Sequence, residues 1–449
     1  PSLAPPKRRD SEFVSVRRSR VLGPRQWATK PPAGSTAPPR GGSSATAGTM
    51  GETAAVASLV KTIIGGGMLA LPAGMAAGGG TGVVPAILTV FAHAALSTYT
   101  YILIGRAVER TDARDFRELW SLAFGAKTAW LIDFMIAGVA TGAILTYGIF
   151  LGDLLSTMLP QWFTRTSAIA TVAVFPLTPL ALAKDLSGLR FSSYAGIAAI
   201  LISALVIVLR SLDGTYIASS VFEGGMPSLQ HVTLGRVSVS SCVLFNMLST
   251  AFMGHTNAVR AYRELADRSR QTPVALKAFA ISAILYAAVM VAGYATFGSY
   301  CKGLVLSNFD SRDTLALVTK AATAVSIIGS HPLIFTSLRD CTLCLAGLVE
   351  RAETHFPTFA AVALTLLVAT ATLSVVIPDA GFVVALNGAS VGAFLICVVP
   401  CLMFLKVKEG PPKAKGEVAL LHVLVAFGSF IALFGTIVTC LSTFTDLLD

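Results

Sequence analysis

The stretch Thr-Ile-Ile-Gly-Gly-Gly-Met-Leu-Ala-Leu-Pro, residues 62–72, places three consecutive glycines and a proline inside an apolar segment of helical length. Each glycine costs up to about 1 kcal/mol in a helix interior, and inside a bilayer the backbone groups that a break frees must find new partners. A break is tolerated there when it lines a cavity. We therefore expect Gly65, Gly66 and Gly67 to unwind a membrane helix. Close helix packing through small residues is the alternative.

The composition around this stretch is that of a polytopic membrane protein. Of the 449 residues, 54% are hydrophobic and only 13% are charged, whereas about 25% are charged in a soluble domain. This excludes a soluble enzyme, a nucleic-acid-binding protein and a disordered chain of this length. The net charge of +10 is concentrated in residues 1–49, which hold nine Lys and Arg against two acidic residues. The charge therefore does not indicate a nucleic-acid partner.

Apolar segments of about 20 residues follow one another from residue 54 onward, and each could cross a hydrocarbon layer of about 30 Å as a helix. Pro176 and Pro179 interrupt one of these segments. We expect an all-α membrane protein with about 11 transmembrane helices, at 54–77, 82–105, 130–159, 166–184, 192–210, 237–262, 274–298, 315–338, 356–377, 381–405 and 417–443.

The distribution of basic residues predicts the orientation in the lipid bilayer. Beyond residue 49, 18 Lys and Arg fall on the side of the N-terminus and five on the other, which places the N-terminus in the cytoplasm. We divide the chain into a disordered basic tail (1–53), a transmembrane domain (54–443) and a short C-terminal tail (444–449). The tail also fits an organelle transit peptide, or an extension of the reading frame upstream of Met50. A vacuolar or other endomembrane location and the plasma membrane both stay open.

A second break is expected in the sixth segment. Ser, Thr, His and Asn gather in Ser249-Thr-Ala-Phe-Met-Gly-His-Thr-Asn257, and such a cluster is costly in mid-membrane unless it faces water or a ligand. The first and sixth segments are five apart, as expected if helices 1–5 and 6–10 form inverted repeats.

With these motifs in view, the chain resembles the amino acid/auxin permease family of amino acid transporters. Residues 61–72 are similar to the first-helix pattern of its vacuolar and proton-assisted branches. Residues 251–255 and 262–270 are similar to the sixth-helix motifs of its sodium-coupled neutral amino acid branch. Residues 293–298 and His331-Pro332 follow in the expected order.

The resemblance implies a leucine-transporter-like 5+5 inverted repeat with helices 1 and 6 broken, alternating access, and symport of a small amino acid with Na⁺ or H⁺. The α-carboxylate of a neutral amino acid would bind at the three glycines. The α-amino group would meet carbonyls near Thr250 and Ala251. Tyr147 would close the pocket; the alternative is that Tyr147 is an ordinary interior aromatic residue.

The sequence departs from the sodium-coupled branch at Lys61, where that branch has an asparagine tied to sodium. The Lys61 ammonium could take the place of the ion, held by the first helix and Ser326 or Ser330, or it could lose its proton when desolvated. This favours proton-coupled or sodium-independent transport, with a lysine that snorkels to the surface as the alternative. His255 is a further candidate for gating or proton transfer. We expect His331 to serve as another titratable group, or to bond the carbonyl that Pro332 leaves free.

No cofactor, metal or catalytic residue is predicted. The seven cysteines include one Cys-x-x-Cys, at Cys341 and Cys344, without the second pair that a zinc site needs. Two rival functions stay open: a sodium-coupled neutral amino acid symporter, and a membrane amino acid sensor that does not transport. The sequence does not specify the amino acids carried or the oligomeric state.

Overall fold

The computed structural model describes residues 48–160, 162–183, 190–216 and 233–445. Over these ranges the chain is helical and forms no β-strand, which confirms the all-α class. The predicted tail up to residue 47 and residues 446–449 lie outside the described residues. The α-helices are α1 (Glu52–Ile63), α2 (Leu71–Ala76), α3 (Val83–Thr111), α4 (Phe116–Phe124), α5 (Trp130–Met158), α6 (Arg165–Val172), α7 (Thr178–Leu182), α8 (Arg190–Leu212), α9 (Ser241–Ala251), α10 (Ala258–Glu264), α11 (Gln271–Phe297), α12 (Thr314–Ala346), α13 (Val349–Thr354), α14 (Phe356–Val376), α15 (Ala380–Asn387), α16 (Val399–Lys406) and α17 (Lys415–Phe444).

Within the described ranges, nine helices are long and apolar enough to cross a membrane, and a tenth span is a helix pair bent by 48°, Glu52–Ile63 with Gly66–Ala76. These ten coincide with ten of the predicted segments. The predicted segment 237–262 instead contains α9 and α10, which are separated at residues 252–257 and are individually too short to span. The first and sixth segments are therefore the two that do not form a straight spanning helix.

The segment 166–184 spans despite its prolines. Residues Arg165–Leu182 qualify as one span, because Pro176 lies in a π-helical turn, Ala173–Leu177, and Pro179 lies in the first turn of α7. A π-helical turn has a widened backbone that accommodates a missing amide hydrogen bond, and the first helical turn does not need that amide.

The break in the first segment begins directly after Ile63. Gly65 is extended (φ −133°, ψ −169°), and a 3₁₀ turn, η2 (Gly66–Ala70), leads into α2. Pro72 stands in the first turn of α2, where its missing N–H costs nothing. The second break follows Ala251 and ends in the 3₁₀ turn η7 (His255–Asn257). Both predicted breaks are thus confirmed.

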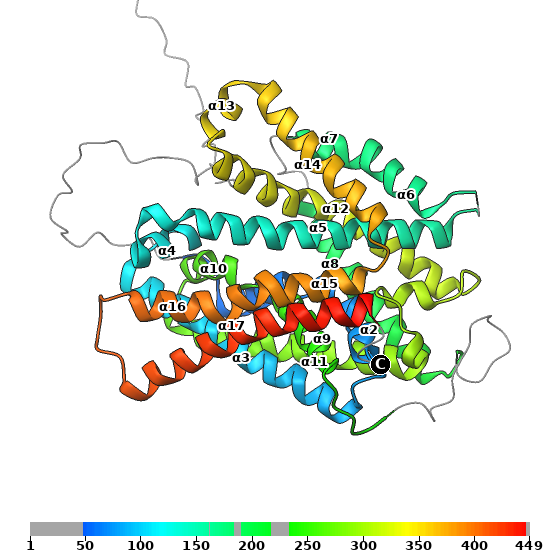
Figure 1. Cartoon of the computed structure of the whole chain (residues 1–449), viewed down its shortest axis with the longest axis horizontal. Helices are drawn as coiled ribbons and strands as arrows, with labels where there is room; N and C mark the ends of the chain where they lie inside the picture. Colours follow the sequence, from blue (N-terminus) through cyan, green and yellow to red (C-terminus); the bar gives the residue numbers. More distant parts are fainter. Residues whose placement is uncertain (1–47, 161, 184–189, 217–232, 446–449) are drawn as a thin grey trace, which may run out of the picture. The chain divides into compact units, whose positions relative to one another are not determined.

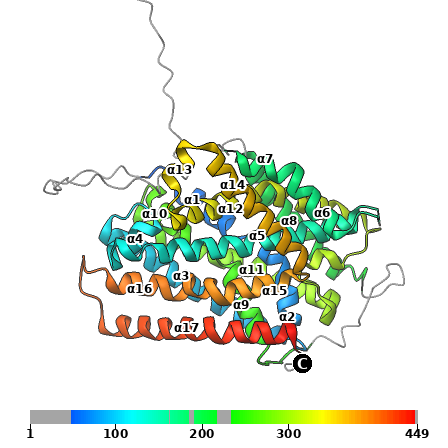
Figure 2. The ribbon, with the colours of Figure 1, turned by 45° about the horizontal axis from the view of Figure 1, so that its top comes forward.

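Long helices surround the two broken segments. Helix α12 packs along α5 and α8, while α11 packs against α3, α8, α1 and α2. Helix α9 contacts α2, α15 and η2, so the halves of the two broken segments are neighbours. Figure 1 shows α5 and α12 side by side, and Figure 2 shows α17 running along α15 and α16. The breaks therefore lie in the packed interior.

Candidate functional site

The two breaks meet at the glycine triplet. A Cβ placed on Gly67 would lie 3.6 Å from the Cα of Ala251. The hydroxyl of Tyr286, from α11, lies 2.8 Å from the carbonyl oxygens of both Ile63 and Ala251, the residues at which α1 and α9 end. The C-terminal ends of these two half-helices therefore share one buried hydrogen-bond donor.

Tyr286 is a site residue that the sequence analysis missed. Its side chain is fully buried, and a hydroxyl has one proton, so it donates to one of the two carbonyls at a time. The available signal was chemical: a tyrosine in the middle of an apolar span needs a polar partner, and carbonyls freed by a helix break are such partners.

Three consecutive amides at the first break are not hydrogen-bonded. The N–H groups of Gly65, Gly66 and Gly67 donate to no residue in the described part of the chain. A Cβ placed on Gly65 would meet nothing within 4 Å, so open space adjoins the first of these amides. Successive free amides at the start of a helix attract a negatively charged group.

Tyr147 lies beside the glycine triplet, and its role in closing the pocket stays a prediction. A Cβ on Gly66 would lie 3.2 Å from Cε1 of Tyr147 and 3.4 Å from Cε2 of Phe150, both on α5. The Tyr147 side chain is partly buried, and its hydroxyl forms no hydrogen bond with the residues described. The glycine triplet, Tyr147 and Ala251 are thus brought together, and the Tyr147 hydroxyl stays available to a ligand.

Thr250 contributes differently from its neighbour. Its Oγ1 donates to the carbonyl of Val384 in α15, at 2.8 Å, so its side chain anchors α15 to the second break. The Thr250 carbonyl accepts from the amide of Met253 at 3.3 Å, and the Ala251 carbonyl accepts from Tyr286. The amide of Phe252 also donates to the Thr250 carbonyl. Since a carbonyl oxygen has two lone pairs, it is the Ala251 carbonyl that keeps capacity for a second donor such as an ammonium group.

The candidate ion-coupling residues occupy separate parts of the site. Lys61 lies in the last turn of α1 and is partly buried. On α12, Ser326 donates to the carbonyl of Gly196 in α8 at 3.3 Å, and a Cβ on Gly196 would lie 3.7 Å from Oγ of Ser330. Both serines therefore face α8. Their predicted association with Lys61 stays a prediction.

His255 joins the second break to α3. Its Nε2 lies 3.0 Å from Oγ1 of Thr100 and 3.2 Å from the carbonyl oxygen of Ser97. The imidazole is fully buried, and its Nδ1 has no partner within the described residues. These contacts link the second break to α3; the predicted role of His255 in gating or proton transfer stays a prediction.

Backbone and ionic contacts hold the start of α1. The amide of Met50 donates to the carbonyl of Glu264 at 2.9 Å, and the amide of Ala266 donates back to Met50 at 3.0 Å. Glu52 pairs with Lys277 at 2.6 Å and approaches Arg270 at 3.8 Å. This end of the first segment is therefore fastened to the polypeptide that follows α10.

The C-terminal end of α8 is held by an ion pair between Arg210 and Asp313. Asp313, which caps α12, receives two hydrogen bonds from Arg210 and one from the hydroxyl of Tyr216. Burial opposes ionisation of this carboxyl group and is the largest single effect, but the hydrogen bonds from Arg210, the Ala316 amide and Tyr216, together with the charge of Arg210, outweigh it and lower the pKa of Asp313. Nearby, the Lys320 ammonium donates to the carbonyl of Phe309 at 2.8 Å. These contacts of Asp313 and Lys320 hold the connection at residues 301–313 against α8 and α12.

Comparison with solved structures shows the fold. The structure entitled "Inward facing conformation of Mhp1" matches with a TM-score of 0.53 at 14% identity, covering 88% of this chain and 90% of that one. This confirms the predicted leucine-transporter-like fold. The fold is thus that of a helical membrane protein in which two broken segments lie side by side.

Sequence comparison gives the family. The family model described as "Transmembrane amino acid transporter protein" matches residues 48–441, so the chain belongs to that family, whose members are transporters rather than enzymes. Similar proteins include Vacuolar amino acid transporter 5 of Schizosaccharomyces pombe, 24% identical over 88% of this chain and 94% of the relative. Sodium-coupled neutral amino acid transporter 7 of Xenopus laevis is 25% identical over 86% of this chain and 88% of the relative.

Proposed function

We propose that this protein carries neutral amino acids across a membrane by alternating access, with the two breaks as the substrate site. The free amides of Gly65, Gly66 and Gly67 bind the α-carboxylate, because each supplies a donor with no other partner among the described residues. The carbonyl of Ala251, beside Thr250, accepts from the α-amino group. The observation that carries the proposal is the row of free amides directly beside the second break.

The walls of the site favour a neutral side chain. The groups nearest the triplet are the rings of Tyr147 and Phe150 and the backbone and methyl group of Ala251. None of these carries a charge that would compensate an acidic or basic substrate. Tyr147 closes the site and directs its free hydroxyl to the substrate. The names of similar proteins, which include neutral amino acid transporters, support this choice.

For the coupling ion we propose H⁺, or transport independent of Na⁺. Lys61, one turn before the break, supplies a positive charge where a coupling cation would otherwise act, with Ser326 and Ser330 of α12 as its partners during the cycle. His255 is the second candidate for proton transfer. The alternative is sodium coupling, which the names of several relatives favour.

For orientation we propose a cytoplasmic N-terminus, supported by the excess of basic residues on that side. The contacts of Met50 and Glu52 then form a cytoplasmic latch on α1. Because residues 264–266 follow the second break, the latch holds both broken segments together on one side of the membrane. Both vacuolar or other endomembrane and plasma-membrane locations agree with this arrangement.

The test is uptake of radiolabelled amino acids by the full chain in liposomes, with and without Na⁺, at two pH values. We expect uptake of neutral amino acids without Na⁺, stimulated by an inwardly directed proton gradient. A strict Na⁺ requirement at fixed pH would overturn the coupling proposal while leaving transport intact. Absence of labelled counterflow under every condition would instead favour a sensor.

A further inference from the structure

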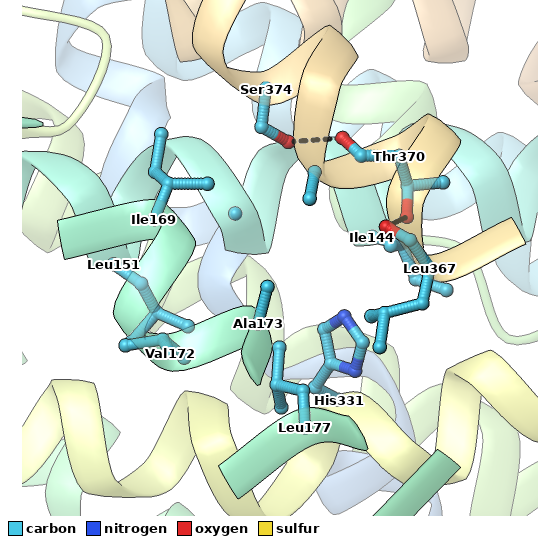
Figure 3. Close-up of a pocket in the computed structure, with 12 residues that line it drawn as sticks. Ile144, Leu151, Ile169, Val172, Ala173, Leu177, His331, Leu367, Thr370 and Ser374 are labelled. Atoms are coloured by element: carbon cyan, nitrogen blue, oxygen red, sulfur yellow. Dashed lines mark hydrogen bonds between the residues drawn. The ribbon is translucent and has the colours of Figure 1, made fainter. Parts of the chain in front are cut away.

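His331 and Asn246 are buried polar side chains that the proposed substrate site does not use. The imidazole of His331 points into a small pocket between α5, α6, α12 and α14, shown in Figure 3. Its ring nitrogens bond to no described residue, so the expected bond to the carbonyl freed by Pro332 is absent there. Asn246 differs from His331 because its side chain joins two helices, α9 and α17.

Asn246 lies in α9 before the second break and is fully buried. Its Nδ2 donates to the carbonyl of Gly435 and to the hydroxyl of Thr439, both in α17 and both at 3.0 Å. A Cβ placed on Gly435 would lie 2.6 Å from Oδ1 of Asn246, so a side chain at residue 435 would displace the amide. The amide therefore reaches the backbone of α17 because a glycine leaves room for it.

The same part of α9 is fastened to the span that contains α15 and α16. Thr250 lies one turn after Asn246, and its hydroxyl donates to the carbonyl of Val384 in α15. A Cβ on Gly388, where the π-helical turn η11 (Gly388–Gly392) begins, would lie only 1.8 Å from the carbonyl oxygen of Asn246. Helix α17 packs in turn on α15 and η11. The end of α9 is therefore held by α15, η11 and α17 together.

Stability alone does not account for an asparagine at this position. The Oδ1 of Asn246 has no hydrogen-bond partner among the described residues, and a buried acceptor without a donor costs free energy. Leucine has the same branched shape and would leave no such atom unpaired, and apolar replacement of buried polar contacts is often neutral. What the amide adds over leucine is a fixed register between the two helices, the best-attested use of a buried polar group.

We propose that Asn246 is a positioning residue of the substrate site. Through its amide, α17 fixes the register of α9 and with it the carbonyl of Ala251, which accepts from the substrate amino group. The inference rests on the amino acid site proposed above. It gives a role to α17, which follows the two inverted repeats of five helices and whose outer face is exposed at Leu433 and Ile437.

The test compares Asn246→Leu with two threonine variants of α17. A hydrogen bond between membrane helices changes an equilibrium constant about threefold on average. Asn246→Leu loses both bonds and should weaken amino acid binding about eightfold, without lowering the midpoint of thermal unfolding. Thr439→Val loses one bond and should weaken binding about threefold. Thr436→Val is the matched control, because the hydroxyl of Thr436 bonds the carbonyl of Ala432 in its own helix, and it should bind like the wild type.

A second readout does not depend on any amino acid. Ala251 is buried, so alkylation of an Ala251→Cys variant, followed by mass spectrometry without substrate, reports how often the end of α9 opens. Adding Asn246→Leu should make this alkylation about eightfold faster, and adding Thr436→Val should leave the rate unchanged. If the wild type binds no amino acid, the proposed function fails, whereas these rates still decide the role of Asn246.

Unchanged binding and unchanged alkylation in Asn246→Leu would overturn the proposal. A loss of binding matched by an equal loss of stability would also overturn it, because the amide would then serve folding alone. Equal effects of Thr439→Val and Thr436→Val would do the same, since the bond between the helices would not be the cause.

Discussion

Replacing Tyr286 with phenylalanine removes the donor that joins the two breaks and keeps the ring in place. In the wild type, one hydroxyl lies 2.8 Å from the carbonyls at which both α1 and α9 end. A neutral hydrogen bond contributes about 1 kcal/mol net, and a buried acceptor left without a donor costs about 1–3 kcal/mol. We therefore expect Tyr286→Phe to make the free energy of amino acid binding less favourable by about 1–3 kcal/mol, because the two breaks are no longer held together.

At about 1.4 kcal/mol for each factor of ten, this corresponds to amino acid binding roughly 5- to 140-fold weaker. The assay is equilibrium binding of the radiolabelled amino acid with the highest wild-type uptake, together with thermal unfolding. The control is Tyr101→Phe, because Tyr101 is equally buried and its hydroxyl makes no hydrogen bond with the described residues. Wild-type affinity in Tyr286→Phe would refute the idea that this hydroxyl organises the two breaks.

Two further predictions concern the ion pairs of Glu52 with Lys277 and of Asp313 with Arg210. Glu52→Gln removes the acidic partner of Lys277, an exposed pair worth up to about 1 kcal/mol. Alkylation of a Leu59→Cys variant should therefore rise about two- to fivefold, and an unchanged rate would contradict the latch. Asp313→Asn leaves Arg210 with Asp213 alone and should lower stability by about 2 kcal/mol, less than a fully orphaned charge costs. Because the pKa of Asp313 is lowered in the folded state, its contribution is complete above the ordinary value near 4 and is lost as the pH falls through the folded value. Asp313→Asn should therefore flatten the acid side of the stability profile, and a profile identical to the wild type would contradict this.

The breaks were predictable because their signals are local. Three glycines followed by Pro72 weaken a helix wherever it packs, and the polar run 249–257 cannot remain in lipid without partners. The prolines at 176 and 179 were a local signal that misled, because they indicated an interruption of the segment 166–184. Their segment nevertheless spans, since a π-helical turn absorbs Pro176.

The partners of the site residues were not predictable, because they come from distant parts of the chain. Nothing near Thr250 indicates that its hydroxyl would bond Val384, and nothing near Tyr286 indicates that it would join two breaks. Such contacts depend on how α11 and α15 pack against the broken segments, and a single sequence does not encode that register as a local pattern.

The central claim is that the amides at the first break bind the substrate carboxylate, and Gly65→Ala tests it most directly. Gly65 has an ordinary extended conformation and open space around its missing Cβ, so alanine should fold normally while its methyl group occupies the carboxylate position. Gly51→Ala is the matched control, since its Cβ also meets nothing within 4 Å. Losing charge-assisted hydrogen bonds should weaken amino acid binding by at least about tenfold. Wild-type binding by folded Gly65→Ala would contradict the account.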